Sequence, residues 1–148
     1  MVVCAIFGGT AFAIRALNLV IPIGGPFVID ARDIPGVVGA VLAGPFGGII
    51  VGILAGLPAK FPIVDVPSYA SAYFLVGLLA PRFKWLSGLA VLLGYFVAAT
   101  IVWQIGLLPS FNLAFVLLAP RMIIVPVQIL ILYTIFKTIP TIIESIQK

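Results

Sequence analysis

Long apolar runs make up almost the whole chain, and only proline and glycine clusters and a few isolated charges interrupt them. Only 8% of the 148 residues are charged whereas 64% are hydrophobic, so polar side chains are too few to cover an apolar core in water. A helix needs about 20 apolar residues to cross a hydrocarbon layer of roughly 30 Å. The sequence therefore predicts a single all-α transmembrane domain over residues 1–148.

Proline, glycine and charged residues divide this domain into six predicted transmembrane helices, because such residues are costly or disruptive inside a lipid-facing helix. The predicted segments are 1–21, 33–44, 46–57, 67–81, 85–108 and 113–139. The second and third are short, and the alternative is one helix over 33–57. Gly44 and Pro45 favour two short helices, because glycine favours a turn and proline removes a helical hydrogen bond.

The basic residues predict how the helices are oriented in the membrane. Arg82 and Lys84 follow the fourth segment, whereas Lys137 and Lys148 close or follow the sixth. Because basic loops tend to stay in the cytoplasm, we expect a multi-pass protein of the cell membrane with both termini cytoplasmic. The outer face then carries a mixed set of charges, namely Asp30, Arg32, Asp33, Lys60 and Asp65.

Two arginines inside predicted helices indicate a polar cavity. Arg15 and Arg121 are predicted at a similar depth in the outer part of the membrane, where an unpaired cation costs at least a few kcal/mol. They predict a pocket for a ligand with an anionic group, such as a carboxylate or a phosphate. The alternatives are that Arg15 reaches outward to water, or that either arginine pairs with Asp30, Asp33 or Asp65.

Polar and aromatic residues at the same level extend this predicted site. Their rings and hydrogen-bonding groups suit a flat ligand, although the aromatic residues could instead form an interfacial belt and the glutamine an interhelical hydrogen bond. The predicted substrate-binding residues are Arg15, Asn18, Asp30, Tyr69, Tyr73, Trp103, Arg121 and Gln128. Pro120 and Pro126 interrupt the sixth segment, as happens in helices near transporter sites.

The sequence gives no indication of catalysis. It has no histidine and a single cysteine, Cys4, so it lacks the commonest general base and cannot form an internal disulfide. No glycine-rich phosphate loop with its lysine is present. We expect a protein that is not an enzyme, with no metal site and no cofactor in this chain. The scattered basic residues also predict no nucleic-acid partner.

A stripe of small residues marks one face of the first predicted helix. Ala5, Gly9 and Ala13 repeat every four residues, which lets another helix approach closely. At 100° per residue the stripe points away from Arg15 and Asn18. One face is thus predicted to dock a partner while another faces the pocket, and packing within the same chain is the alternative.

Two stretches resemble the S components of energy-coupling-factor (ECF) transporters. Residues 27–35 read Phe-Val-Ile-Asp-Ala-Arg-Asp-Ile-Pro, and residues 39–52 contain the Gly44-Pro45 turn and several further glycines. In that family a loop leads into an Asp-x-Pro helix start, an apolar helix, a Gly-Pro turn and a glycine-rich third helix. The resemblance implies a six-helix bundle that binds a small water-soluble nutrient, such as a vitamin or an amino acid, near the outer surface.

The resemblance also implies partners. The stripe of Ala5, Gly9 and Ala13 would dock the transmembrane coupling subunit, with Gly9 in place of an alanine. Separate ATPase subunits would hydrolyse ATP to drive release of the substrate inside. Membrane sensor modules of the LytS type share the Arg-Asp helix start and the Gly-Pro turn, and they normally feed a signalling domain. A sensor of this type is therefore the second possible function, after the transporter subunit. A structural subunit of a larger membrane complex is the third.

Overall fold

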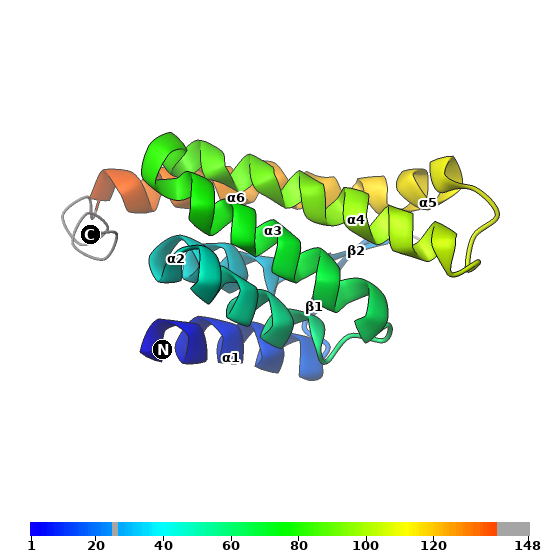
Figure 1. Cartoon of the computed structure of the whole chain (residues 1–148), viewed down its shortest axis with the longest axis horizontal. Helices are drawn as coiled ribbons and strands as arrows, with labels where there is room; N and C mark the ends of the chain where they lie inside the picture. The colour runs from blue at the N-terminus through cyan, green and yellow to red at the C-terminus, as the bar shows by residue number, and fades with distance from the viewer. Residues whose placement is uncertain (25–26, 139–148) are drawn as a thin grey trace.

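A computed structural model describes residues 1–24 and 27–138 (Figure 1). The chain is mostly helical, with two long apolar helical stretches, several shorter helices and one small β-hairpin. The α-helices are α1 Val2–Ala16, α2 Asp33–Gly56, α3 Pro62–Phe83, α4 Val91–Gln104, α5 Phe111–Leu118 and α6 Ile124–Thr138. Two 3-10 helices, η1 Lys84–Ala90 and η2 Ala119–Ile123, precede α4 and α6, and strands β1 Val20–Gly24 and β2 Phe27–Asp30 connect α1 to α2.

The helices pack in the order of the sequence. Helix α1 lies on α2, α2 on α3 and α3 on α4, while α6 packs against η1. The start of α1 and the end of α6 lie toward the same end of the bundle, at the left in Figure 1. The stretches 33–56 and 62–104 are long and apolar enough to cross a membrane by length and composition.

Helix α2 is interrupted in its middle, which confirms the predicted break at Gly44 and Pro45. Gly44 has φ 71° and ψ −172°, far from helical values. The two halves then fold back on each other. Their far ends meet where the side chain of Arg32, just before the first half, donates to the carbonyl oxygen of Ala55, near the end of the second half, at 2.6 Å. The second and third predicted segments are thus two short antiparallel helices.

Replacing Gly44 with alanine is expected to destabilise the protein through backbone strain. A Cβ atom added at Gly44 would meet no described atom within 4 Å, but only glycine adopts this φ and ψ without strain. We expect the free energy of unfolding in mixed micelles to fall by about 1–3 kcal/mol. Gly9→Ala is the matched control, because Gly9 is helical and equally open. A Gly44→Ala variant as stable as the control would contradict this account.

The connection between α1 and α2 differs from the prediction. The first helix was expected to reach residue 21, but it ends at Ala16 because Asn18 adopts a left-handed conformation with φ 54°. The β-branched residues Val20 and Ile21 then favour an extended chain. Strands β1 and β2 pair antiparallel, with Val20 opposite Asp30. The expected loop is therefore a β-hairpin, and α1 is about 22 Å long at 1.5 Å per residue.

The later segments also differ at their ends. The fourth helix was predicted to begin at residue 67, but α3 begins at Pro62, which suits the first turn as well as Pro67 does. Asp65 therefore lies in the first helical turn and not in a polar loop. The sixth predicted segment is two helices, α5 and α6, separated by η2, which contains Pro120. The predicted interruption by Pro120 is confirmed, whereas Pro126 lies within α6.

Candidate functional site

The most buried charge in the described part of the chain is the guanidinium of Arg32, a residue with 0% exposure. Its Nη1 donates to the carbonyl oxygen of Ala55 at 2.6 Å, and its Nη2 donates to Oδ2 of Asp65 at 2.8 Å. Its Nε forms a 2.9 Å ion pair with Oδ2 of Asp30. Arg32 therefore joins the hairpin, the end of α2 and the start of α3.

The ends of the helices explain why these charges converge. The last carbonyls of a helix lack intrahelical partners and carry partial negative charge, so the cation of Arg32 at Ala55 satisfies one of them. Asp33 and Asp65 lie in the first turns of α2 and α3, where the partial positive charge of a helix start favours a carboxylate. The fold-back at Gly44 brings these three helix ends together.

We call Arg32, Asp30, Asp33 and Asp65 the cluster. Tyr69 packs against it. The Cζ atom of Arg32 lies 4.4 Å from the centre of the Tyr69 ring, a cation–π distance. The Tyr69 hydroxyl donates to Oδ1 of Asp33 at 2.7 Å. The Tyr69 side chain thus contacts both the cation of Arg32 and the carboxylate of Asp33.

Arg15 joins the cluster from the last turn of α1. Its Nη1 lies 3.6 Å from Oδ2 of Asp30, and both side chains are mostly buried. The carboxylate of Asp30 therefore lies between two arginines, because it also pairs with Arg32 and accepts a hydrogen bond from the backbone N–H of Arg32 at 3.2 Å. The structure thus contains the ion pair between Arg15 and Asp30, which was the alternative to a role of Arg15 in binding an anionic ligand.

The charge on Arg32 is stable despite its burial. Burial opposes the charged form, but the neighbouring Tyr69, Asp30 and Asp65 together outweigh it and raise the pKa of Arg32 above its ordinary value. The guanidinium is therefore cationic at every accessible pH, and the cluster keeps this positive centre.

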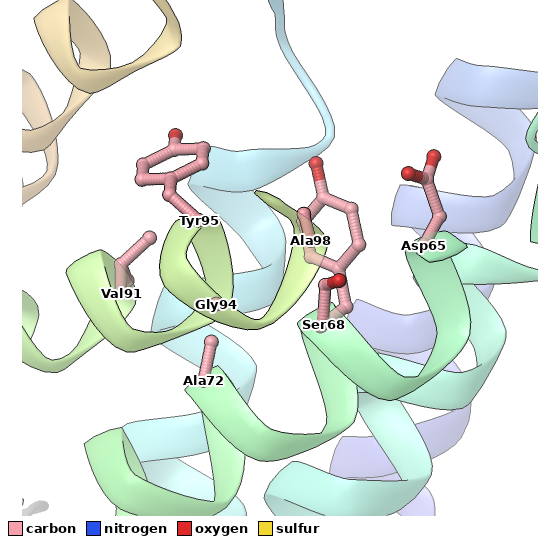
Figure 2. Close-up of a pocket in the computed structure, with 8 residues that line it drawn as sticks. Asp65, Ser68, Ala72, Val91, Gly94, Tyr95 and Ala98 are labelled. Atoms are coloured by element: carbon pink, nitrogen blue, oxygen red, sulfur yellow. The ribbon is translucent and has the colours of Figure 1, made fainter. Parts of the chain in front are cut away.

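A pocket lies beside the cluster, between α3 and α4. The pocket is small and partly open to the surroundings. Figure 2 shows the side chains of Asp65 from α3 and Tyr95 from α4 directed to the same side. The lining residues are Asp65, Ser68, Tyr69, Ala72, Val91, Gly94, Tyr95 and Ala98.

Gly94 allows the two walls of this pocket to approach closely. A Cβ atom at Gly94 would lie 2.8 Å from the Cβ of Ala72 and 2.8 Å from the carbonyl oxygen of Ser68. A larger residue would therefore push α4 away from α3 or fill the space between them. The pocket combines small apolar residues on its inner wall with a carboxylate and hydroxyl groups near the cluster.

Two further polar side chains are buried without hydrogen bonds in the described part of the chain. They are the hydroxyl of Tyr73 and both amide atoms of Gln128. The Tyr73 hydroxyl lies against Gly36, where a Cβ atom would overlap it, and its ring packs edge-on against Tyr69 with centroids 5.5 Å apart. Tyr73 thus contacts the cluster through the ring of Tyr69. Gln128 lies on α6 and does not line the pocket.

The remaining predicted site residues are not all brought together. Asn18 is exposed in the turn after α1. Trp103 is 46% exposed at the end of α4 and packs edge-on against Phe111. Neither lines the pocket. The side chain of Arg121 lies outside the part of the chain that the structure describes, so its predicted role stays a prediction.

The small-residue stripe faces outward from α1. The buried face of α1 carries Cys4, Gly8 and Ala11, whereas Ala5 and Ala13 are exposed. A Cβ atom at Gly9 would meet no described atom within 4 Å. Within the described part of the chain, this face of α1 is therefore open at Gly9 and exposed at Ala5 and Ala13, and its predicted docking role stays a prediction.

Sequence reasoning placed Arg32, Asp33 and Asp65 among the outer loop charges but did not assign them to the site. Tyr95 and Gly94 were missed altogether. An indication was present, because Arg32 stands between two aspartates in a chain with only 8% charged residues. Such a concentration of charge at a helix start predicts a network of ion pairs.

No protein-family model, curated protein or solved structure matches the chain.

Proposed function

We propose that this chain is the substrate-binding membrane subunit of an ECF-type importer, and that it captures a small water-soluble nutrient in the pocket between α3 and α4. The observation that carries the proposal is the fully buried Arg32 with its acidic partners beside that pocket. Buried ion networks in membrane proteins are costly and usually mark substrate or ion sites. The six-helix crossing and the outer position of the pocket belong to this proposal.

The fold supports capture from one side of the membrane. The hairpin, the end of α1 and the start of α3 meet at the cluster. Because the start of α1 lies at the far end of the same helix, the pocket would open at the face opposite the N-terminus. With a cytoplasmic N-terminus this is the outer face, where a nutrient is captured.

Native mass spectrometry of the gently solubilised protein tests this proposal. A small molecule retained in stoichiometric amount is expected, and its mass would identify the nutrient. Ala98→Leu is expected to remove it by filling the pocket, since Ala98 is 5% exposed and lines the wall. Ala16→Leu is the control, because Ala16 is exposed on α1. A molecule retained equally by both variants would show that it binds elsewhere.

Partner docking is tested at the outward stripe of α1. Gly9→Leu is expected to abolish co-purification with an ECF coupling subunit, because a large side chain would keep the partner helix at a distance. The melting temperature of the isolated chain should not fall, since a Cβ atom at Gly9 would meet no described atom within 4 Å and leucine is a better helix residue than glycine. Ala16→Leu provides the control on the same helix. Undiminished co-purification of Gly9→Leu would exclude this docking face and favour a sensor or a structural subunit.

A further inference from the structure

We infer that one surface at the N-terminal end of the bundle binds the phosphate group of an anionic lipid. This surface consists of Arg82, Lys84, Trp85, Tyr133 and Lys137, and we call it the basic patch. The inference goes beyond the proposed function, because it requires a membrane but neither a nutrient nor a coupling subunit. The apolar stretches 33–56 and 62–104 are long enough to cross that membrane.

Three elements bring the basic patch together. Arg82 lies in the last turn of α3, Lys84 begins η1 and Lys137 lies in the last turn of α6. Because α6 packs against η1, the rings of Trp85 and Tyr133 meet edge-on with centroids 5.9 Å apart. The Nζ atom of Lys137 lies 5.8 Å from the centre of the Tyr133 ring. Cations from separate parts of the chain thus share one surface, at the end of the bundle that is on the left in Figure 1.

The three cations are exposed, and in the part of the chain that the structure describes they form no ion pair with a carboxylate. The described aspartates, Asp30, Asp33 and Asp65, all belong to the cluster. Asp65 lies in the first turn of α3 and Arg82 in the last, so about 25 Å of helix separates them. Charges so far apart are largely screened by salt. A lipid phosphate is a suitable partner for the basic patch, because lysine and arginine form charge-assisted hydrogen bonds with phosphate oxygens.

Aromatic side chains beside these cations favour a lipid over a soluble anion. Tyr133 is 44% exposed and Phe83 is 47% exposed, and the Cζ atom of Arg82 lies 5.7 Å from the centre of the Phe83 ring. Tryptophan and tyrosine are enriched where a membrane meets water, and long basic side chains near helix ends extend from there toward the headgroups. The exposed rings can contact acyl chains, which a soluble anion lacks. Phosphatidylcholine carries its own cation beside the phosphate, so the basic patch suits a lipid with a net negative charge.

Backbone strain at Lys84 singles out one of these cations. Its φ of 50° and ψ of −125° favour glycine, because a side chain is strained at this positive φ. The Ser87 hydroxyl donates to the carbonyl oxygen of Lys84 at 2.6 Å, which stabilises the turn between α3 and η1. Strained residues cluster at functional sites, so a lysine at a position that suits glycine supports a role for its charge.

The two tryptophans of the chain, Trp85 and Trp103, allow the lipid to be located. The full chain is reconstituted in vesicles of phosphatidylglycerol and phosphatidylcholine in equal parts, and one of the two lipids carries bromine, which quenches tryptophan fluorescence on contact. Trp103→Phe leaves Trp85 as the reporter in the basic patch, and Trp85→Phe leaves Trp103, which is 46% exposed at the end of α4. We expect brominated phosphatidylglycerol to quench Trp85 with an apparent affinity about fivefold or more above that of brominated phosphatidylcholine, since one basic residue near an anionic surface contributes about that factor. The two lipids should quench Trp103 equally.

Two variants test the cations themselves, both with Trp85 as the only tryptophan. Arg82→Gln, Lys84→Gln and Lys137→Gln together should abolish the preference for phosphatidylglycerol. Brominated phosphatidylcholine should still quench this combined variant, which checks that Trp85 still faces lipid. Lys60→Gln is the matched control, because Lys60 is exposed just before the start of α3 and its Nζ also lies near an aromatic ring, at 5.7 Å. This control should keep the whole preference.

Four outcomes would overturn the inference. Equal quenching of Trp85 by the two lipids would show that the patch has no preference, and an equal preference at Trp103 would show a general attraction to the chain. A preference that survives the combined variant would arise outside the basic patch. Loss of the preference when inorganic phosphate replaces chloride at constant ionic strength would assign the patch to a soluble anion.

A carboxylate of the same chain is the remaining alternative occupant. Glu144 is the fourth acidic residue of the sequence and lies outside the described residues. If a lipid occupies the basic patch, Glu144→Gln leaves the preference at Trp85 unchanged. A preference that appears or rises severalfold in Glu144→Gln would show that this side chain occupies the patch in place of a lipid, and would overturn the inference.

Discussion

Replacing Arg32 with alanine is expected to lower the free energy of unfolding by about 3–5 kcal/mol, because it breaks a buried ion-pair network and leaves Asp30 with Arg15 alone. Asp30 and Asp65 both lose their ion pair with this side chain, and the carbonyl oxygen of Ala55 loses its donor. The contacts that hold the hairpin and α3 against the end of α2 disappear together. Unfolding in mixed micelles, followed by circular dichroism, measures the loss.

Two further variants show whether the loss of stability arises from the N–H donors of the Arg32 guanidinium. Arg32→Lys keeps the charge but lacks the planar guanidinium that donates to both the Ala55 carbonyl oxygen and Asp65, so we expect an intermediate loss of stability. Arg82→Ala removes an exposed arginine from α3, and its effect should stay within about 0.5 kcal/mol. Equal stability of Arg32→Ala and Arg82→Ala would show that the buried network does not hold the fold.

The break in α2 could be predicted from local chemistry alone. Gly44 and Pro45 both oppose a continuous helix, and the structure places the non-helical residue at Gly44. The prediction succeeded because both signals are local. Glycine tolerates a positive φ and proline lacks an N–H group, whatever the rest of the fold does. Other boundaries depend on a choice between equivalent signals, as at α3, where Pro62 and Pro67 both suit a first turn.

The β-hairpin shows where residue type was misread. Val20, Ile21 and Ile29 are β-branched, but the nearby prolines and glycines indicated a loop. Strand pairing depends on a partner strand, and the pairing of Val20 with Asp30 involves residues on both sides of that loop. The hairpin matters for the site because it delivers Asp30 to the cluster.

The cluster could be predicted only in part, because its centre depends on tertiary contacts. Arg15, Asp30 and Tyr69 were predicted as site residues, and they contact Arg32 or its partners. Arg32 itself was read as a loop charge. Its partners Ala55 and Asp65 are 23 and 33 residues away, and the fold-back at Gly44 and the start of α3 bring them near.

Gly48→Ala is expected to disrupt the contact between α2 and α3 that positions this cluster. A Cβ atom at Gly48 would lie 2.3 Å from the backbone oxygen of Tyr73, and backbone atoms cannot move aside as a flexible side chain does. The two helices must separate, and Tyr69 and Tyr73 move with α3. We expect the free energy of unfolding to fall by about 3 kcal/mol, the upper part of the usual range for overpacking.

The control for this variant is the same substitution on a free helix face. Alanine is a better helix residue than glycine, so Gly9→Ala should stabilise α1 slightly, by about 0.4–1 kcal/mol, because a Cβ atom at Gly9 would meet no described atom within 4 Å. The two substitutions therefore have opposite expected signs although their chemistry is identical. If Gly48→Ala also stabilises the protein in mixed micelles, α2 and α3 are not in backbone contact at this position. The positions of Asp65 and Tyr69 relative to Arg32 would then need another explanation, since that contact sets the register of α3 beside the end of α2.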